Sequence, residues 1–106
     1  MGDLQIMAFR AKPGQRARLE ALARYNVPML RRSGFVTSRP ENVTWADKDT
    51  LIAVFEWVDG AKDRAKSHPD VRALAIDLSE VGTRVPLHKL PKDRVTQATG
   101  GVQAIN

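Results

Sequence analysis

Asn26, Trp57 and His68 are the residues whose types and positions are best suited to chemistry on an organic ligand. Asn26 lies on the apolar stripe of a predicted helix, where a side-chain amide can hydrogen-bond a carbonyl or a developing oxyanion. Trp57 ends an apolar run, and its indole can stack on an aromatic ring. His68 can accept a proton near neutral pH. We therefore take these three as the candidate catalytic residues.

Each of the three also has a structural interpretation. A tryptophan at the end of a strand is more often part of the core. His68 directly precedes Pro69, where a helix N-cap is a common role. The Asn26 amide could equally bond a backbone carbonyl that Pro28 leaves free. The residues that we predict to bind substrate around these three are Tyr25, Arg39, Trp45 and Phe55.

The composition excludes several kinds of site. There is no cysteine, so neither a thiolate metal site nor a cysteine nucleophile can form. The two histidines, His68 and His88, are too few for a histidine-rich metal site, and His88 is expected on the surface. No phosphate-binding loop, nucleophile elbow or zinc-helix motif occurs. We therefore predict neither a metal nor a cofactor.

The distribution of charge along the chain indicates which kinds of partner the protein could bind. Residues 1–39 carry eight Lys or Arg and two acidic residues, whereas nine basic and ten acidic residues follow. A solvated helix face explains this bias better than nucleic-acid binding does. The run LIAVFEWV also lacks the basic and glycine positions of an RNA-recognition strand. No apolar run approaches 18 residues and no leader is recognisable, so we expect no membrane contact and a cytoplasmic protein.

The elements that would position these residues follow from the hydrophobic periodicity, which alternates between strand and helix spacing. The pattern predicts one domain over residues 1–90 in the order βαββαβ, and a polar tail over 91–106 that is disordered or lies on a partner. Pro28 should kink or loosen the first helix, and Asp59 should cap the second. The predicted strands are 4–11, 35–39 with 43–46, 51–58 and 83–87. The predicted helices are 13–32 and 60–81, the second interrupted at Pro69 and restarting after it.

The predicted order corresponds to an α+β, ferredoxin-like antiparallel sheet. Right-handed crossovers place the strands in the spatial order 4-1-3-2. The first and third strands are apolar on both faces, as central strands should be, and Pro40 and Pro86 fall at the edges. Two helices can cover only one face. We therefore expect a homodimer through the other face, and a modest apolar pocket for a small apolar or aromatic ligand between sheet and helices.

The stretch FEWVDGAKDRAKSHPDVRAL, residues 55–74, and the closing VPLHKLP, residues 85–91, carry a family resemblance. Over residues 3–91 the chain resembles the antibiotic biosynthesis monooxygenase superfamily of dimeric α/β-barrel proteins. The resemblance implies a dimeric barrel and one of two activities. The first is cofactor-independent oxygenation of anthrone-type or quinol substrates.

The second activity is oxidative haem degradation, which uses an Asn on the first strand, a Trp ending the third and a His in the last helix. Only Trp57 matches this set, because the first-strand position falls near Met7 and the helix position near Ala75 or Ile76. We therefore expect a cofactor-independent monooxygenase for a small electron-rich aromatic or quinol-type substrate. The alternative is a non-catalytic small-molecule-binding or structural homodimer of the same fold.

Overall fold

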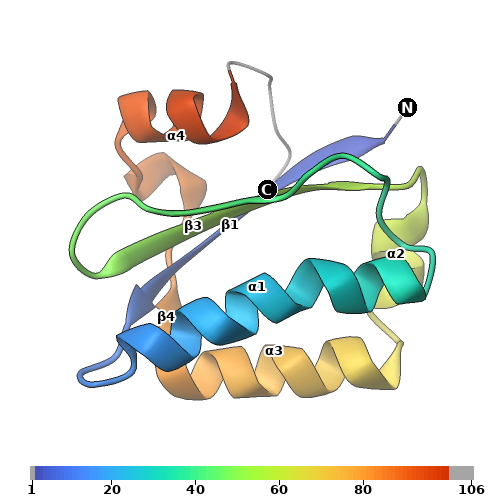
Figure 1. The fold of residues 1–106 in the computed structure, drawn as a ribbon, viewed down its shortest axis with the longest axis horizontal. Helices are drawn as coiled ribbons and strands as arrows, with labels where there is room; N and C mark the ends of the chain where they lie inside the picture. The colour runs from blue at the N-terminus through green and yellow to red at the C-terminus, as the bar shows by residue number, and fades with distance from the viewer. Residues whose placement is uncertain (1, 101–106) are drawn as a thin grey trace.

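The computed structural model describes residues 2–100, and Figure 1 shows their arrangement. The two longest helices lie side by side on one face of the sheet, and a shorter helix lies on the other face. The elements in chain order are β1 (Asp3–Ala11), α1 (Arg16–Arg32), β2 (Asn42–Trp45), β3 (Thr50–Trp57), α2 (Ala61–Ala65), α3 (Pro69–Val81), β4 (Gly82–Arg84), the 3-10 helix η1 (Leu87–Lys89) and α4 (Lys92–Thr99).

The four strands form one antiparallel sheet in the order β2-β3-β1-β4. The predicted βαββαβ order and the ferredoxin-like sheet are confirmed, with β1 and β3 at the centre. The register pairs Gln5 with Phe55 and Phe9 with Leu51. The two edge strands, which we predicted next to Pro40 and Pro86, are shorter than predicted. Residues 35–39 contribute only a bridge between Val36 and Trp57, and the last strand ends at Arg84.

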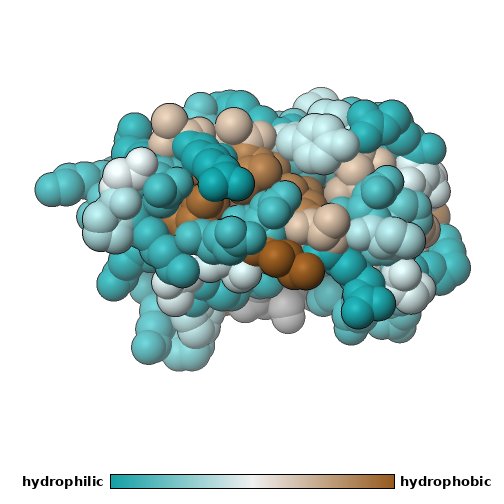
Figure 2. Space-filling view, turned by 90° about the horizontal axis from the view of Figure 1, so that it is seen from below, coloured by the Kyte–Doolittle hydropathy of each residue, from teal (hydrophilic) through white to brown (hydrophobic). Residues whose placement is uncertain are grey.

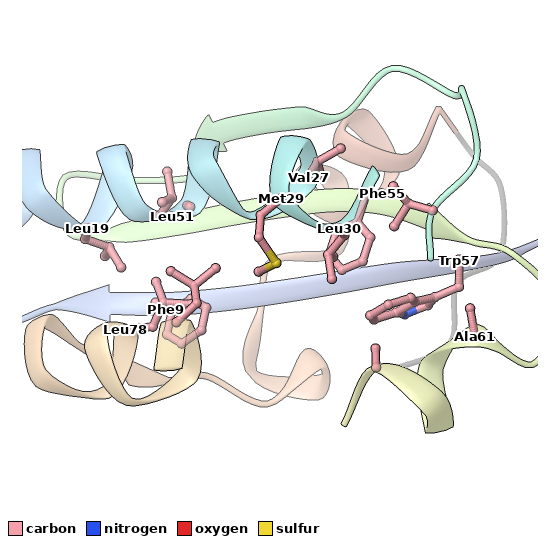
Figure 3. Packing of buried hydrophobic residues seen from close by; sticks show 14 of the residues in the cluster. Phe9, Leu19, Val27, Met29, Leu30, Leu51, Phe55, Trp57, Ala61 and Leu78 are labelled. Carbon is pink, nitrogen blue, oxygen red and sulfur yellow. The ribbon is translucent and has the colours of Figure 1, made fainter. Parts of the chain in front are cut away.

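The main core lies between the sheet and the helices α1 and α3. The buried residues of α1 recur every three or four positions, which places them on one stripe. In Figure 3, Leu30 of α1 faces Phe55 of β3, and Phe9 of β1 lies beside Leu78 of α3. Each such large side chain contributes about 1.5–3 kcal/mol when it is fully buried. This core fixes the height of the helices above the sheet.

Two local predictions concern the helices. The first helix reaches Arg32 as predicted, and Pro28 lies within it on its exposed side. The cap of α2 is Gly60 and not Asp59, and no side chain caps that helix. Gly60 has a φ of 76°, a left-handed conformation that glycine adopts without the steric cost of a Cβ. The turn therefore depends on backbone conformation where we expected a carboxylate cap.

The predicted polar tail is also different, because its residues 92–99 form α4 on the second face of the sheet (Figure 1). The Asn42 amide donates a 3.0 Å hydrogen bond to the carbonyl of Ala98 and ties α4 to β2. The remaining tail residues, 101–106, lie outside the described part. A second apolar cluster forms under α4 from Leu4, Ile6, Ala8, Ala46, Ile52, Val54, Leu90 and Ala98.

This second cluster changes the reasoning behind the predicted dimer. We assumed that two helices leave one apolar sheet face bare. Ile6 and Ile52 on that face are 1% and 0% exposed within a single chain. The homodimer therefore stays a prediction, but a bare sheet face no longer supports it. Over residues 2–100, no helix combines the length and the apolar character that crossing a membrane requires.

Candidate ligand-binding site

A cavity of about 300 Å³ lies between the helix-covered face of the sheet and the helices α1 and α3. This volume is at the lower end of the range for small-molecule pockets, about 300–1,000 Å³. Figure 2, seen from below the helices of Figure 1, shows hydrophobic residues in a hollow surrounded by hydrophilic ones. The cavity is lined by Met7, Phe9, Asn26, Leu30, Phe55, Trp57, Val71, Leu74, Ala75, Leu78, Ser79, Gly82 and Arg84.

Asn26 brings an amide to this apolar wall. The residue is 8% exposed and lies on the buried stripe of α1. Its side chain makes no hydrogen bond to the residues described, and neither amide atom is sealed away from the cavity. The predicted alternative, in which the amide bonds the carbonyl freed by Pro28, is therefore not formed. The amide is available to donate to, or accept from, a ligand.

Trp57 lines the same cavity, and its position is fixed by a partner that sequence reasoning missed. The indole Nε1 donates a 3.1 Å hydrogen bond to Oε1 of Gln5, which is itself buried. The Gln5 amide nitrogen donates in turn to the carbonyl of Ile6. The Phe55 ring meets the indole edge-on, with ring centroids 5.1 Å apart. The hydrogen bond to Gln5 and the edge-on contact with Phe55 therefore together fix the orientation of the indole ring.

Arg84, the last residue of β4, is the second lining residue that sequence reasoning missed. It pairs with Phe9 across the sheet, and its guanidinium carbon lies 5.7 Å from the centroid of the Phe9 ring. Much of the side chain remains exposed, which places it at the cavity mouth. Partial burial of the guanidinium nevertheless lowers the pKa of Arg84. The only sequence signal for this position is strand alternation, which puts Arg84 on the same face of the strand as Gly82.

His68 lies outside the cavity lining and caps α3, the structural role that we weighed against catalysis. Its Nδ1 accepts a 3.2 Å hydrogen bond from the backbone N–H of Asp70. Its Nε2 is 3.5 Å from the Ser33 hydroxyl, and its ring meets Phe35 edge-on. An accepting Nδ1 requires the neutral ring with its proton on Nε2. The structure therefore does not bring His68 together with Asn26 and Trp57.

Tyr25 and Arg39, predicted as rim residues, also lie away from this cavity. Tyr25 is 48% exposed on the outer side of α1, and its hydroxyl accepts a 2.9 Å hydrogen bond from Arg32. Arg39 lies 4.0 Å from the carboxylate of Glu56 on an exposed side of the fold. Exposed pairs of this kind contribute about 0–1 kcal/mol. Both residues are surface contacts here.

Trp45, the third predicted rim residue, connects β2 to α1. Its Nε1 donates a 2.6 Å hydrogen bond to Glu20, and the Arg16 guanidinium lies 4.0 Å above its ring. The hydrogen bonds from Trp45 and Arg24 lower the pKa of the Glu20 carboxyl. Of the four predicted substrate-binding residues, Phe55 alone therefore lines the cavity.

A larger hollow, about 460 Å³, lies where the β1–α1 turn meets the β2–β3 turn. Two of its basic side chains already bind the backbone. Lys12 donates to the carbonyl of Ser79 and Arg16 to that of Lys48, each at 3.0 Å. No group of three or more His, Cys, Asp or Glu comes together anywhere in residues 2–100 in a way that could hold a metal ion. The apolar cavity is therefore the stronger candidate site.

Comparisons with known proteins give one similar fold. No protein-family model and no curated protein matches the chain. A solved structure of tetracenomycin F2 cyclase from Streptomyces glaucescens, a type-II polyketide cyclase, superposes with a TM-score of 0.54. The two chains are 20% identical, and the match covers 86% of this chain and 88% of the other. The similarity is one of fold.

Proposed function

We propose that this chain binds a small, planar, electron-rich aromatic molecule in the cavity and acts on it as a cofactor-independent monooxygenase. The observation that carries the proposal is the Asn26 amide, which is unpartnered among the described residues and lines an otherwise largely apolar cavity of about 300 Å³. Because the amide atoms open into the cavity, a ligand oxygen can replace water as their hydrogen-bond partner in largely apolar surroundings.

The proposed reaction is balanced without an external reductant. An activated methylene group of the substrate, as in an anthrone, loses one proton and becomes a carbanion. The carbanion passes electrons to O₂ and forms a carbon–oxygen bond, and protonation of the distal oxygen gives a hydroperoxide. Loss of water from the hydroperoxide leaves a ketone. One CH₂ group and one O₂ thus become one C=O group and one H₂O.

The roles of the residues follow from what lines the cavity. Asn26 would donate a hydrogen bond to the oxygen on which the substrate's negative charge is delocalised. Trp57, held in place by Gln5, would stack on the ring system and keep water out. No Asp, Glu, His or Lys belongs to the described lining. We therefore infer that the substrate is acidic enough to ionise in water and that the protein stabilises the anion.

Ring closure of a polyketide-like substrate is the second candidate. The solved structure that this fold resembles is described as a polyketide cyclase. An aldol-type closure needs the same stabilised enolate but consumes no O₂. The non-catalytic binding protein remains the third alternative. A purely structural protein would have this space filled by side chains, and the open volume beside Trp57 and Phe55 argues against that form of the alternative.

The decisive experiment measures O₂ uptake with a panel of anthrones and quinols. The variants are Asn26→Ala and Trp57→Phe, with Asn42→Ala as the control that removes an amide on the other sheet face. We expect uptake above the uncatalysed rate, lost in Asn26→Ala and retained in Asn42→Ala. Conversion of a poly-β-ketone added to the panel, without O₂ uptake, would favour ring closure. Binding without any turnover would contradict both reactions.

We also propose that the chain forms a homodimer across the face that carries α4. A hollow of about 410 Å³ lined by Leu87, His88, Leu90, Lys92, Val95 and Thr96 lies there and offers apolar contact area. Light scattering of the full chain tests this. We expect twice the mass of 11.8 kDa, reduced towards one chain by Val95→Glu. A monomer at all accessible concentrations would contradict the proposal.

A further inference from the structure

No hydrogen bond or ion pair within residues 2–100 explains the positive charge of Arg84. It ends β4, and strand alternation puts it on the same side as Gly82, so both residues face the cavity. Its guanidinium carbon lies 5.7 Å from the centroid of the Phe9 ring, a weak cation–π contact. The strand pairing that holds β4 in place involves only its backbone.

The charge of Arg84 has no anionic partner within residues 2–100. Three arginines outside the cavity lining are engaged, because Arg31 donates to backbone carbonyls, Arg32 to a tyrosine hydroxyl and Arg24 to a carboxylate. Arg84 makes no hydrogen bond and no ion pair to any residue described. It is also the only charged side chain of the described lining. A ligand is therefore the group that can neutralise it.

We propose that Arg84 is a specificity-determining residue that selects aromatic ligands carrying a carboxylate. The inference rests on the proposed ligand site and names the chemical class of its occupant. The guanidinium presents parallel N–H donors in a fixed plane, a geometry that matches the two oxygens of a carboxylate. The apolar wall formed by Phe9, Phe55 and Leu78 would hold the ring system of the same ligand.

The surroundings of Arg84 support this choice of anion. Desolvation is the sole cause that lowers its pKa, so the site disfavours an uncompensated charge there. A bound carboxylate would remove that penalty, whereas a neutral ligand would add to it. Because the guanidinium also keeps contact with water, its contribution falls at the lower end of the range for charge-assisted hydrogen bonds. We expect about a tenfold effect on affinity.

The test compares two probes of nearly the same shape, 2-naphthoate and 2-naphthamide, by calorimetric titration of the full chain at pH 7. The wild type should bind naphthoate about tenfold more tightly than naphthamide. Arg84→Gln should weaken naphthoate about tenfold and leave naphthamide within twofold. Arg84→Lys, which keeps the charge without the fork, should fall between. Added salt should weaken naphthoate selectively, since it screens the pair.

Two controls separate this inference from general effects. Arg18→Gln removes one positive charge from an exposed position on α1 outside the cavity, so it should leave both affinities unchanged. Arg84→Met keeps the apolar part of the side chain and serves if Arg84→Gln is unstable. Equal affinity for the two probes, or an Arg84 variant that binds naphthoate as the wild type does, would overturn the inference alone. If neither probe binds, the proposed ligand site fails as well.

Discussion

The hydrogen bond between Gln5 and Trp57 supports a quantitative prediction, because both partners are buried at 3% and 7% exposure. Replacing Gln5 by Leu keeps a side chain of similar size but removes the acceptor. The indole N–H would then be buried without a partner, which costs about 1–3 kcal/mol. We expect a loss of about 2 kcal/mol in the free energy of unfolding.

For a domain of this length, 1 kcal/mol corresponds to a change in Tm of about 4 °C, so Gln5→Leu should lower Tm by about 8 °C. Trp57→Phe leaves the Gln5 oxygen unpartnered and also removes ring volume, so it should cost at least as much. The double variant lacks both polar partners. Its loss should be smaller than the sum of the single losses by about 1–2 kcal/mol.

The assay is urea unfolding followed by far-ultraviolet circular dichroism, which does not depend on the tryptophans. The matched control combines Gln5→Leu with Trp45→Phe. Trp45 bonds Glu20 and pairs with Leu51, four residues along β3 from the partner of Gln5, so these two losses should add. A coupling below about 0.5 kcal/mol for Gln5 and Trp57, or an equal coupling in the control pair, would refute the reasoning.

Three further perturbations have expected outcomes. Burial raises the pKa of Glu41, whose Oε2 has no hydrogen-bond partner among the described residues. Its folded pKa therefore lies above its unfolded one, and its contribution to stability is lost as pH rises through the folded value. Glu41→Gln should thus raise the free energy of unfolding at pH 7, by less than about 1 kcal/mol because solvent screens this partly buried carboxyl, and have little effect near pH 3, as pH-dependent urea titrations can check. Gly82→Ala should cost about 1–3 kcal/mol by calorimetry, because a Cβ there would lie 3.2 Å from the Arg10 carbonyl and 3.3 Å from Leu19 and Phe9; an unchanged Tm would show that these neighbours move freely. His68→Ala removes the cap of α3 and should cost about 1 kcal/mol while leaving ligand affinity unchanged, and a loss of turnover at full stability would return His68 to the site.

The sheet could be predicted from the sequence because its physical cause is local. Runs that are apolar on both faces, such as the one ending at Trp57, need cover on both sides and so belong at the centre. Proline lacks an N–H, so Pro40 and Pro86 indicate where pairing stops. The helix α4 was missed because its sequence is mostly polar. Its few apolar residues, such as Val95 and Ala98, suffice only because a sheet face is present to receive them.

The site was only partly predictable for a different reason. Asn26 and Trp57 lie on apolar stripes, so periodicity alone directs them to the cavity. The contact of Gln5 with Trp57 depends on the register between β1 and β3, which no local pattern contains. The meeting of Arg84 with Phe9 likewise depends on the pairing of the last strand with the first. These long-range pairings decide the polar part of the site.

The position of α4 has a consequence for how the chain folds as it is synthesised. Ile6 belongs to one of the first segments made, yet its cover includes Leu90 and Ala98, which are made some ninety residues later. The core under α1 and α3 can close once α3 has been made, whereas the second face stays open until α4 follows. Exposed apolar strands are prone to aggregation, so the nascent chain is most vulnerable during that interval. The order of synthesis thus sets the order in which the two cores can form.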